Sequence, residues 1–122
     1  MAHPNQITGR CWVSVNGALL RSKTGAKLTG VGGLERKPVT GPQVWGHVEN
    51  AVAPTIEATL VHTPDLSLRA LNAIVDGTVT FETDTGTTFV LRHAWCQTAP
   101  GVVEGEGEIA VVFGGMSIEE MP

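Results

Sequence analysis

The 122-residue sequence contains no tyrosine, and its aromatic residues are only three Phe and three Trp. Cysteine is equally scarce, because Cys11 and Cys96 are the two in the chain and they lie far apart. Two cysteines at this separation fit neither a disulfide framework nor the close-spaced ligand pairs of a zinc site. We therefore expect two buried, reduced thiols, no metal and no cofactor.

Basic residues are also few. The chain has 8 Lys and Arg against 12 Asp and Glu, which gives a net charge of −4, and no basic stripe occurs along it. Tight nucleic-acid binding is disfavoured, since it needs such a stripe to neutralise phosphates. No window approaches the roughly 18 apolar residues of a membrane span, and the first residues lack the apolar core of a signal peptide. We expect a soluble protein that stays in the cytoplasm.

Glycine, proline and β-branched residues are what the sequence has in excess. Gly (15) and Pro (7) make up 22 of the 122 residues, about 18% against a typical ~12%. Val, Thr and Ile supply 34 residues, the class that fits the pleated surface of a sheet. One hydrophobic core is expected at this length. The composition predicts a single, mainly β domain over residues 1–122 with many turns.

The first clear element is a hairpin over residues 7–21, centred on Asn16-Gly17. Asn-Gly favours a two-residue type I′ turn, and this turn fixes the register of the two strands. The register places Trp12 and Leu19 on the face opposite the expected core. Because both faces then carry apolar bulk, the second face needs another surface to cover it, such as a second chain.

Residues 22–54 form the least regular stretch, because six glycines and three prolines interrupt any period. A loop of roughly 30 residues in a compact domain is usually a functional arm or a disordered linker. Apolar side chains argue against a solvated linker; they are Leu28, Val31, Leu34, Val39, Val44, Trp45 and Val48. We expect an extended arm or loop that contacts another subunit.

A strand is predicted over residues 55–62, where side chains alternate, and a single helix is predicted over residues 66–75. Asp65 lies near the expected helix start, and an Asp-Gly pair follows its end. His62, Asp65 and Ser67 contain the residue types of a nucleophilic triad. Crowded at a helix start, Asp and Ser are better interpreted as capping residues.

A second hairpin is predicted over residues 78–95. A three-residue loop at residues 84–86 is favoured over a two-residue loop because it sets Phe81 opposite Phe89. The last predicted strand covers residues 106–113, with one apolar and one mixed face.

Other chemical patterns in the chain are weak. His93 and Cys96 suggest a zinc site but lack a second close-spaced pair. The glycines of residues 29–33 lack the Lys-Ser/Thr of a phosphate loop and are interpreted as turn glycines. The acidic stretch at residues 104–108 is interpreted as a solvated turn, with a surface that repels polyanions as the alternative.

A series of segments occurs in a characteristic order, from a strand through a Thr-Pro-Asp helix and a hairpin to an acidic final strand. The segments are Gly9, residues 13–17, 35–46, 53–60, 63–71, 78–82, 86, 89–95 and 105–114. Together they resemble the tail tube proteins of Mu-like phages, over nearly the whole chain. The specificity lies in the order of the segments, since none of them is a catalytic motif.

The resemblance implies an antiparallel β-sandwich or barrel-like domain with one packed helix, and a structural virion protein rather than an enzyme. It further implies six subunits per ring and rings stacked into a tube, through which the tape measure protein and then DNA pass. Implied partners are a tail sheath, the tape measure protein, a baseplate or tube initiator and a tail terminator. The implied location is the virion tail, assembled in the host cytoplasm.

Two sets of residues follow as candidates for assembly. Inter-subunit contacts are expected at Trp12, Leu19, Leu28, Val31, Leu34, Val44 and Trp45. A lumen that lets DNA slide should carry small neutral or acidic side chains; the candidates are Thr78, Thr80, Glu82, Glu106 and Glu108. The alternatives are a type VI secretion-like tube protein and a small monomeric β-barrel binding module or enzyme with a concave polar pocket.

Overall fold

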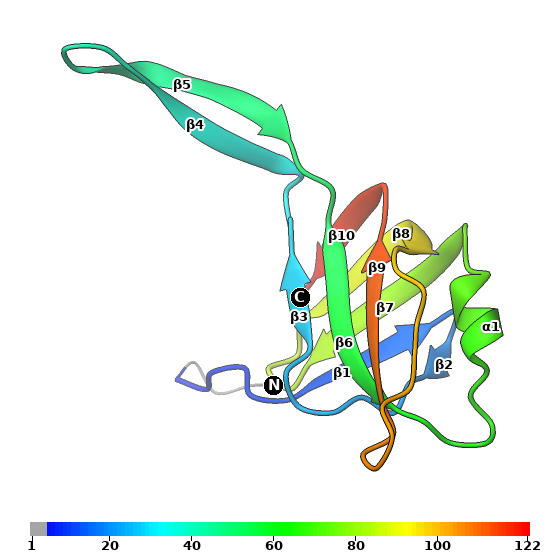
Figure 1. Cartoon of the computed structure of the whole chain (residues 1–122). Coiled ribbons are helices and arrows are strands. Elements are labelled where there is room, and N and C mark those ends of the chain that lie inside the picture. Colours follow the sequence, from blue (N-terminus) through cyan, green and yellow to red (C-terminus); the bar gives the residue numbers. More distant parts are fainter. Residues whose placement is uncertain (1–4) are drawn as a thin grey trace.

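The computed structural model describes residues 5–122, so the first four residues of the predicted domain lie outside the described part. One antiparallel sheet bends over into two layers that enclose the core, and a two-stranded hairpin projects away from it (Figure 1). The predicted mainly β, antiparallel fold is confirmed. Among residues 5–122, no helix is long and apolar enough to span a membrane.

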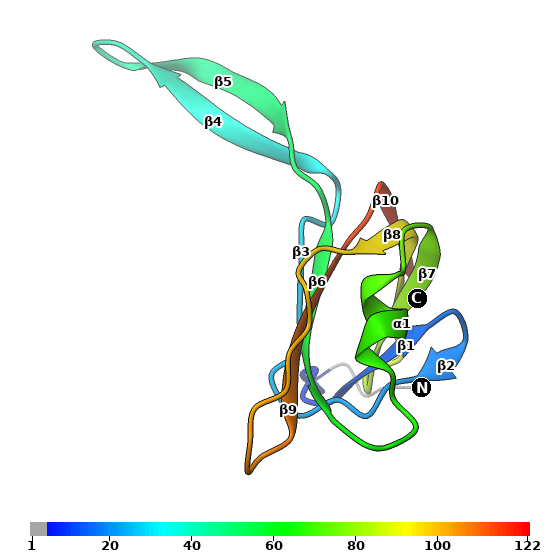
Figure 2. The same ribbon diagram turned by 45° about the vertical axis from the view of Figure 1, so that its right-hand side comes forward.

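The first layer has the strand order β2-β1-β7-β8, with β10 paired to β8. These strands are β1 (Cys11–Val15), β2 (Ala18–Leu19), β7 (Gly77–Thr83), β8 (Thr88–Cys96) and β10 (Ser117–Met121). The second layer continues from the end of β8 through β9 and β6 to β3. Its strands are β3 (Lys27–Thr29), β6 (Thr55–Val61) and β9 (Glu108–Gly114), seen on one side of the molecule in Figure 2.

A bulge in β8 is what carries the chain from one layer to the other. Val79 pairs with Leu91, whereas Gly77 pairs with Ala94, so β8 has one more residue than β7 in this interval. His93 occupies the left-handed region at φ 52°, and its Nδ1 lies 2.8 Å from Asp76 Oδ1. Bulges bend a strand and increase its twist. Beyond the bulge, β8 pairs with β9.

The core lies between the layers, and buried and more exposed side chains alternate along β6 and β7. The side chains that lose all or nearly all contact with solvent are Val13, Ile56, Leu60, Val79, Leu91, Ile109, Val111 and Phe113. Leu71 of helix α1 closes the cluster. No polar or charged side chain is buried within the part of the chain that the structure describes. Purely apolar burial of this kind is the dominant favourable term in folding.

Both predicted hairpins of the first layer form in the predicted register. The Asn16-Gly17 turn has φ angles of 49° and 87°, as a type I′ turn requires, and Val15 pairs with Ala18. In the second hairpin Phe81 pairs with Phe89, and the ring centroids lie 6.3 Å apart in an edge-on arrangement. The three-residue loop is therefore correct.

The helix and the last strand are shorter than predicted. Helix α1 covers Leu68–Asn72 rather than residues 66–75, because Ser67 is its N-cap and Ala73 its C-cap. Ser67 Oγ accepts a hydrogen bond from the Ala70 amide at 3.2 Å, so the capping interpretation is confirmed for this residue. Strand β9 begins at Glu108 rather than at residue 106, since residues 104–106 form a turn.

Residues 22–54 are more regular than their glycines and prolines indicated. Strand β3 pairs with β6 in the second layer, and a bridge joins Ser22 to Leu60. The projecting part is the hairpin of β4 (Leu34–Thr40) and β5 (Val44–Ala51), called the arm below. Gly33 and Val52 stand side by side where the arm leaves the body, with the Val52 amide 2.9 Å from the Gly33 carbonyl oxygen.

Candidate assembly surfaces

The first layer has an uncovered face on the side away from the core. Along β7 the side chains of Val79 and Phe81 are buried, while Thr78 and Glu82 are exposed and Thr80 is half-buried. The three polar residues predicted for the lumen thus share one face of one strand. We call this surface the outer face.

The outer face also contains Trp12, which was predicted as an inter-subunit contact. Trp12 of β1 pairs directly with Glu82, and Ser14 pairs with Thr80 on one side and with Leu19 on the other. Directly opposed residues project from the same face of a sheet. The structure therefore brings the β7 lumen candidates together with Trp12 and Leu19.

Charge on the outer face is mostly paired. Arg92 donates to Glu119 through Nε at 2.9 Å and through Nη2 at 3.1 Å, a bidentate arrangement between β8 and β10. These hydrogen bonds and the guanidinium charge lower the pKa of the Glu119 carboxyl. The Arg10 guanidinium stacks over Trp12 with its central carbon 5.7 Å from the ring centroid. Glu82 forms no ion pair with any described residue.

The structure separates the other two lumen candidates from β7. Glu108 begins β9 in the second layer, where it pairs with Val61. Its Oε1 lies 2.6 Å from Lys23 Nζ, and this hydrogen bond is the main cause of its lowered pKa. Glu106 lies in the preceding turn and not in a strand. The carboxylates of Glu106 and Glu108 therefore belong to the end of the second layer.

The arm is exposed along both strands. Leu34, Val39, Val44, Trp45 and Val48 all project from it with 40% or more of their surface accessible, and Val31 lies exposed just before it. An isolated two-stranded hairpin is marginally stable in water, and this one places apolar side chains in solvent. Leu28 differs from the other predicted contacts, because it lies in β3 and packs against the core of its own chain.

A compact tip ends the arm. The register shifts between Val39 and Thr40, which leaves Trp45 as an extra residue in β5. The Trp45 ring lies against the backbone of the turn, since a Cβ added at Gly41 would meet Trp45 Nε1 at 2.6 Å. Trp45 nevertheless keeps 64% of its surface exposed. The tip therefore presents an aromatic face that no part of the described chain covers.

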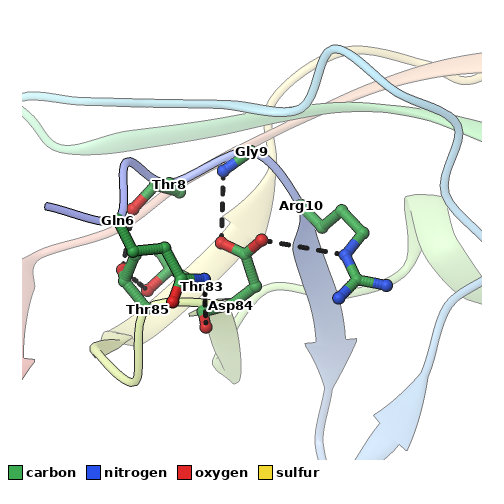
Figure 3. A network of polar contacts seen from close by, with 7 residues as sticks. All are labelled: Gln6, Thr8, Gly9, Arg10, Thr83, Asp84 and Thr85. Atoms are coloured by element: carbon green, nitrogen blue, oxygen red, sulfur yellow. Dashed lines mark hydrogen bonds and ion pairs between the residues drawn. The ribbon is translucent and has the colours of Figure 1, made fainter. Parts of the chain in front are cut away.

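Asp84 ties the segment before β1 to the β7–β8 loop (Figure 3). Its Oδ1 accepts from the Gly9 amide at 3.1 Å, its own amide donates to the Arg10 carbonyl at 3.0 Å, and Oδ2 lies 3.7 Å from Arg10 Nε. Thr8 and Thr85 add a contact between their hydroxyls at 2.8 Å. The Asp84 side chain is only 13% exposed. No local sequence pattern indicates this network, because its members lie more than 70 positions apart.

A groove of about 410 Å³ lies beside the start of β1. It runs between residues 9–12 and residues 19–26, where the chain leaves β2 and crosses to the second layer. Apolar atoms of Trp12, Leu19 and Leu20 line it, together with the basic residues Arg10, Arg21 and Lys23. We call it the β1 groove. No local sequence pattern predicts this groove, because it forms where the chain leaves the first layer to pair with the second layer.

The two thiols show no sign of reactivity. Cys11 and Cys96 are free and half-buried rather than fully buried as predicted. Burial raises the pKa of both thiols, and the Cys96 thiol donates to the Thr98 carbonyl oxygen at 3.1 Å. Residues 5–122 contain no group of three His, Cys, Asp or Glu side chains placed to hold a metal ion.

Comparison with known proteins identifies the family of the chain. The family model described as "Phage tail tube protein" matches residues 4–120. The tail tube protein of Mu-like prophage FluMu from Haemophilus influenzae is 32% identical over 85% of this chain and 86% of its own length. The tail tube protein of Escherichia phage Mu is 35% identical over 89% of this chain and 90% of its own length.

The fold recurs in a solved structure. "Structure of Hcp1 from Flavobacterium johnsoniae" superposes with a TM-score of 0.61 at 10% sequence identity, covering 90% of this chain and 93% of the other. This likeness supports the sandwich architecture. The family model and the two relatives go further, because they match most of the sequence itself. The chain belongs to the phage tail tube protein family.

Proposed function

We propose that this tail tube protein assembles as rings of six subunits that stack into a tube, and that the tape measure protein and then DNA pass through its lumen. Members of this family are structural proteins of the virion tail and not enzymes. The observation that carries the proposal is the outer face, a broad sheet surface that one chain leaves uncovered. Closing such sheets in a ring removes their free edges.

The β7 residues are the proposed lining of the lumen. Thr78 and Thr80 supply short neutral side chains, and Glu82 on the same face supplies a negative charge that no described residue pairs with. DNA phosphates are repelled or ignored by such a surface, so DNA passes without specific binding. Glu106 and Glu108, in the second layer, are proposed to lie at one end of the lumen rather than along it.

The arm is the proposed contact between stacked rings. It leaves the body at one end, whereas the N-terminal segment and the 104–106 turn lie toward the other (Figures 1 and 2). Apolar surface to bury on a neighbour comes from Leu34, Val44 and Trp45 of the arm and from Val31 just before it. Trp12 and Leu19 are proposed to contact a neighbour within the ring.

The remaining partners follow from the family. A tail sheath would surround the tube, a baseplate or tube initiator would start its growth, and a tail terminator would stop it. Assembly is proposed to take place in the host cytoplasm, and the product is part of the virion tail.

The alternative of a secretion-system tube keeps the same architecture. The sequence likeness favours the phage tail, because the matching relatives at 32% and 35% identity are prophage and phage tail tube proteins. The arm disfavours a monomeric binding module, because a monomer would leave the apolar residues of the arm exposed to water.

Negative-stain electron microscopy of the purified full chain tests the proposal. We expect rings with six subunits and stacks of such rings. A protein that remains monomeric by light scattering at every concentration, and shows no rings on the grid, would contradict the tube assignment. Rings with another number of subunits would correct the stoichiometry alone.

A further inference from the structure

Asn16 differs from the other asparagines of the chain in the residue that follows it. Glycine follows Asn16 alone among the four asparagines, whereas alanine follows Asn50 and Asn72. Asparagine is a chemically labile residue, because the backbone nitrogen of the next residue can attack its side-chain amide. A following glycine has no Cβ to hinder this attack. A Cβ built at Gly17 would meet no described atom within 4 Å, so the turn is open to water.

Strand β7 holds the side chain of Asn16 in the folded chain. Asn16 Oδ1 accepts a hydrogen bond from the Thr78 amide at 2.9 Å, and the Asn16 amide donates to the Thr78 carbonyl oxygen at 2.8 Å. The side-chain amide lies over Gly77, where an added Cβ would meet Oδ1 at 3.2 Å and Nδ2 at 3.4 Å. These contacts fix the side chain against β7. They must break before the Gly17 nitrogen can reach Asn16 Cγ.

The reaction at this turn passes through a succinimide ring. The Gly17 nitrogen loses its proton and forms a bond to Asn16 Cγ, while the bond from Cγ to Nδ2 breaks and ammonia leaves. Water then opens the ring at one of its two carbonyl carbons. Opening at Cγ restores the normal main chain with an aspartate. Opening at the original backbone carbonyl leaves the main chain running through Cβ and Cγ, which is an isoaspartate.

The two products differ in their effect on the hairpin. The aspartate keeps an oxygen for the Thr78 amide, and Asp-Gly also favours a type I′ turn. The isoaspartate adds a carbon to the main chain, so the loop no longer fits the pairing of Val15 with Ala18. Strand β2 has two residues and both are exposed, so little packing offsets this loss. Isoaspartate therefore releases β2, whereas aspartate does not.

We propose that the Asn16-Gly17 turn is a site of spontaneous deamidation, that the pairing of β1 with β7 slows the reaction, and that the isoaspartyl product is excluded from assembly. The last step rests on the proposed ring, in which Leu19 of β2 contacts a neighbour. The substrate is the chain itself, and water is the second reactant. The turn thereby limits how long an unassembled subunit stays competent to join a ring.

Mass spectrometry of peptides from the aged full chain tests the site. The mass change from amide to acid should be larger at Asn16 than at Asn50 and Asn72, which are controls within the same molecule. A protein isoaspartyl methyltransferase should label the peptide that contains residue 16. Ageing the chain unfolded in guanidinium at the same pH should speed the change by about threefold or more, since the rate then gains what one lost hydrogen bond had withheld.

Two variants separate the chemistry from the shape of the turn. Asn16→Gly keeps a dipeptide that favours a type I′ turn and removes the reactive amide. Asn16→Asp carries the product that keeps the hairpin. After ageing, wild type should lose assembly in proportion to its isoaspartate content, whereas Asn16→Gly should keep its initial assembly. Fresh Asn16→Asp should assemble like fresh wild type. Isoaspartate should be enriched in the fraction that stays out of sedimented tubes.

The outcomes separate the steps of this proposal. Equal conversion of Asn16, Asn50 and Asn72 in the unfolded chain would overturn the site. Conversion of Asn16 as fast in the folded chain as in the unfolded chain would overturn the protection by β7. Isoaspartate found equally in tubes and in free subunits would overturn its exclusion from assembly. A wild-type protein that forms no oligomer would overturn the proposed ring and the exclusion step, whereas the mass change would still decide whether residue 16 is modified.

Discussion

At the scale of single residues, Asp84 makes polar contacts through both its side chain and its backbone. It connects the segment before β1 to the β7–β8 loop through the Gly9 amide and the Arg10 backbone. We expect Asp84→Ala to lower the free energy of unfolding by about 1–3 kcal/mol, because a largely buried acceptor is lost and the amide of Gly9 loses its partner. Urea denaturation measures the change.

Asp65→Ala is the matched control for Asp84, since this carboxylate is exposed and its side-chain contacts to Arg21 and Thr63 lie at the surface. It should change the unfolding midpoint little, as exposed ion pairs contribute little. Equal midpoints for the two alanine variants would contradict the role assigned to Asp84.

Gly30 is the residue at which the arm segment turns away from β3. Its φ is 82°, and a Cβ would come within 2.7 Å of both the Ala53 carbonyl oxygen and Pro54 Cα. Because these are backbone atoms, neither can move aside cheaply. Gly30→Ala should destabilise the fold by about 1–3 kcal/mol. Gly101→Ala, where no atom lies within 4 Å, should leave the melting temperature unchanged or slightly raised.

At the scale of elements, β10 is tied to the body by its pairing with β8 and by the Arg92–Glu119 contact. The pKa of Glu119 is lowered in the folded state, so the contact adds stability above the ordinary value of 4.5 and loses it as the pH falls through the lowered pKa. Glu119→Gln should therefore unfold at a lower urea concentration than wild type near neutral pH.

The same variant should match the wild type in acid, because the carboxyl of Glu119 is then protonated in both states of the wild-type chain. Unfolding curves at about pH 7 and at a pH below the lowered pKa of Glu119 measure this convergence. A gap between the two proteins that is the same at both pH values would contradict the assignment.

The arm is the element whose removal separates folding from assembly. The Gly33 carbonyl and the Val52 amide are hydrogen-bonded at its base, so Asn-Gly in place of residues 34–51 should close the gap as a short turn. We expect this deletion to keep the circular dichroism spectrum of the body and its melting temperature. Rings should form but should not stack. Tubes of normal length in negative stain would contradict the axial role.

Elements with local signals were predictable from the sequence, and elements that depend on distant partners were not. The Asn16-Gly17 turn and the Phe81–Phe89 pairing were correct because turn chemistry and facing residues lie close together in the chain. Strand β10 was missed, since Ser117–Met121 has no alternation of its own and is ordered by β8. The arm hairpin was hidden by its two prolines and its glycines, which an exposed hairpin tolerates.

The candidate surfaces likewise include features that were predictable from the sequence and features that were not. Alternation along β7 placed Thr78, Thr80 and Glu82 on one face. It did not reveal that Trp12 shares that face, because the pairing of β1 with β7 joins residues about 70 positions apart. The β1 groove was not predictable from the sequence either, because it depends on where the chain after β2 crosses to the second layer.

At the scale of the whole molecule, a chain with net charge −4 leaves its unpaired carboxylate Glu82 on the proposed lumen face. Glu82→Lys changes each subunit by two charges at this place. Because Glu82 lies on a sheet face and contacts no ion-pair partner among the described residues, the variant should fold and assemble like wild type. Its tubes should then bind short DNA, whereas wild-type tubes should not, and the binding should weaken steeply with salt.

Fluorescence anisotropy of a labelled oligonucleotide added to assembled tubes measures the difference. Glu57→Lys, an exposed carboxylate of β6 in the second layer, is the matched control, since it adds the same charge away from the proposed lumen. Equal binding by the two lysine variants would place residue 82 outside the lumen. Binding by wild-type tubes would contradict the view that the acidic balance of this chain lets DNA pass without adhering, because a lumen that holds DNA at rest also slows its passage.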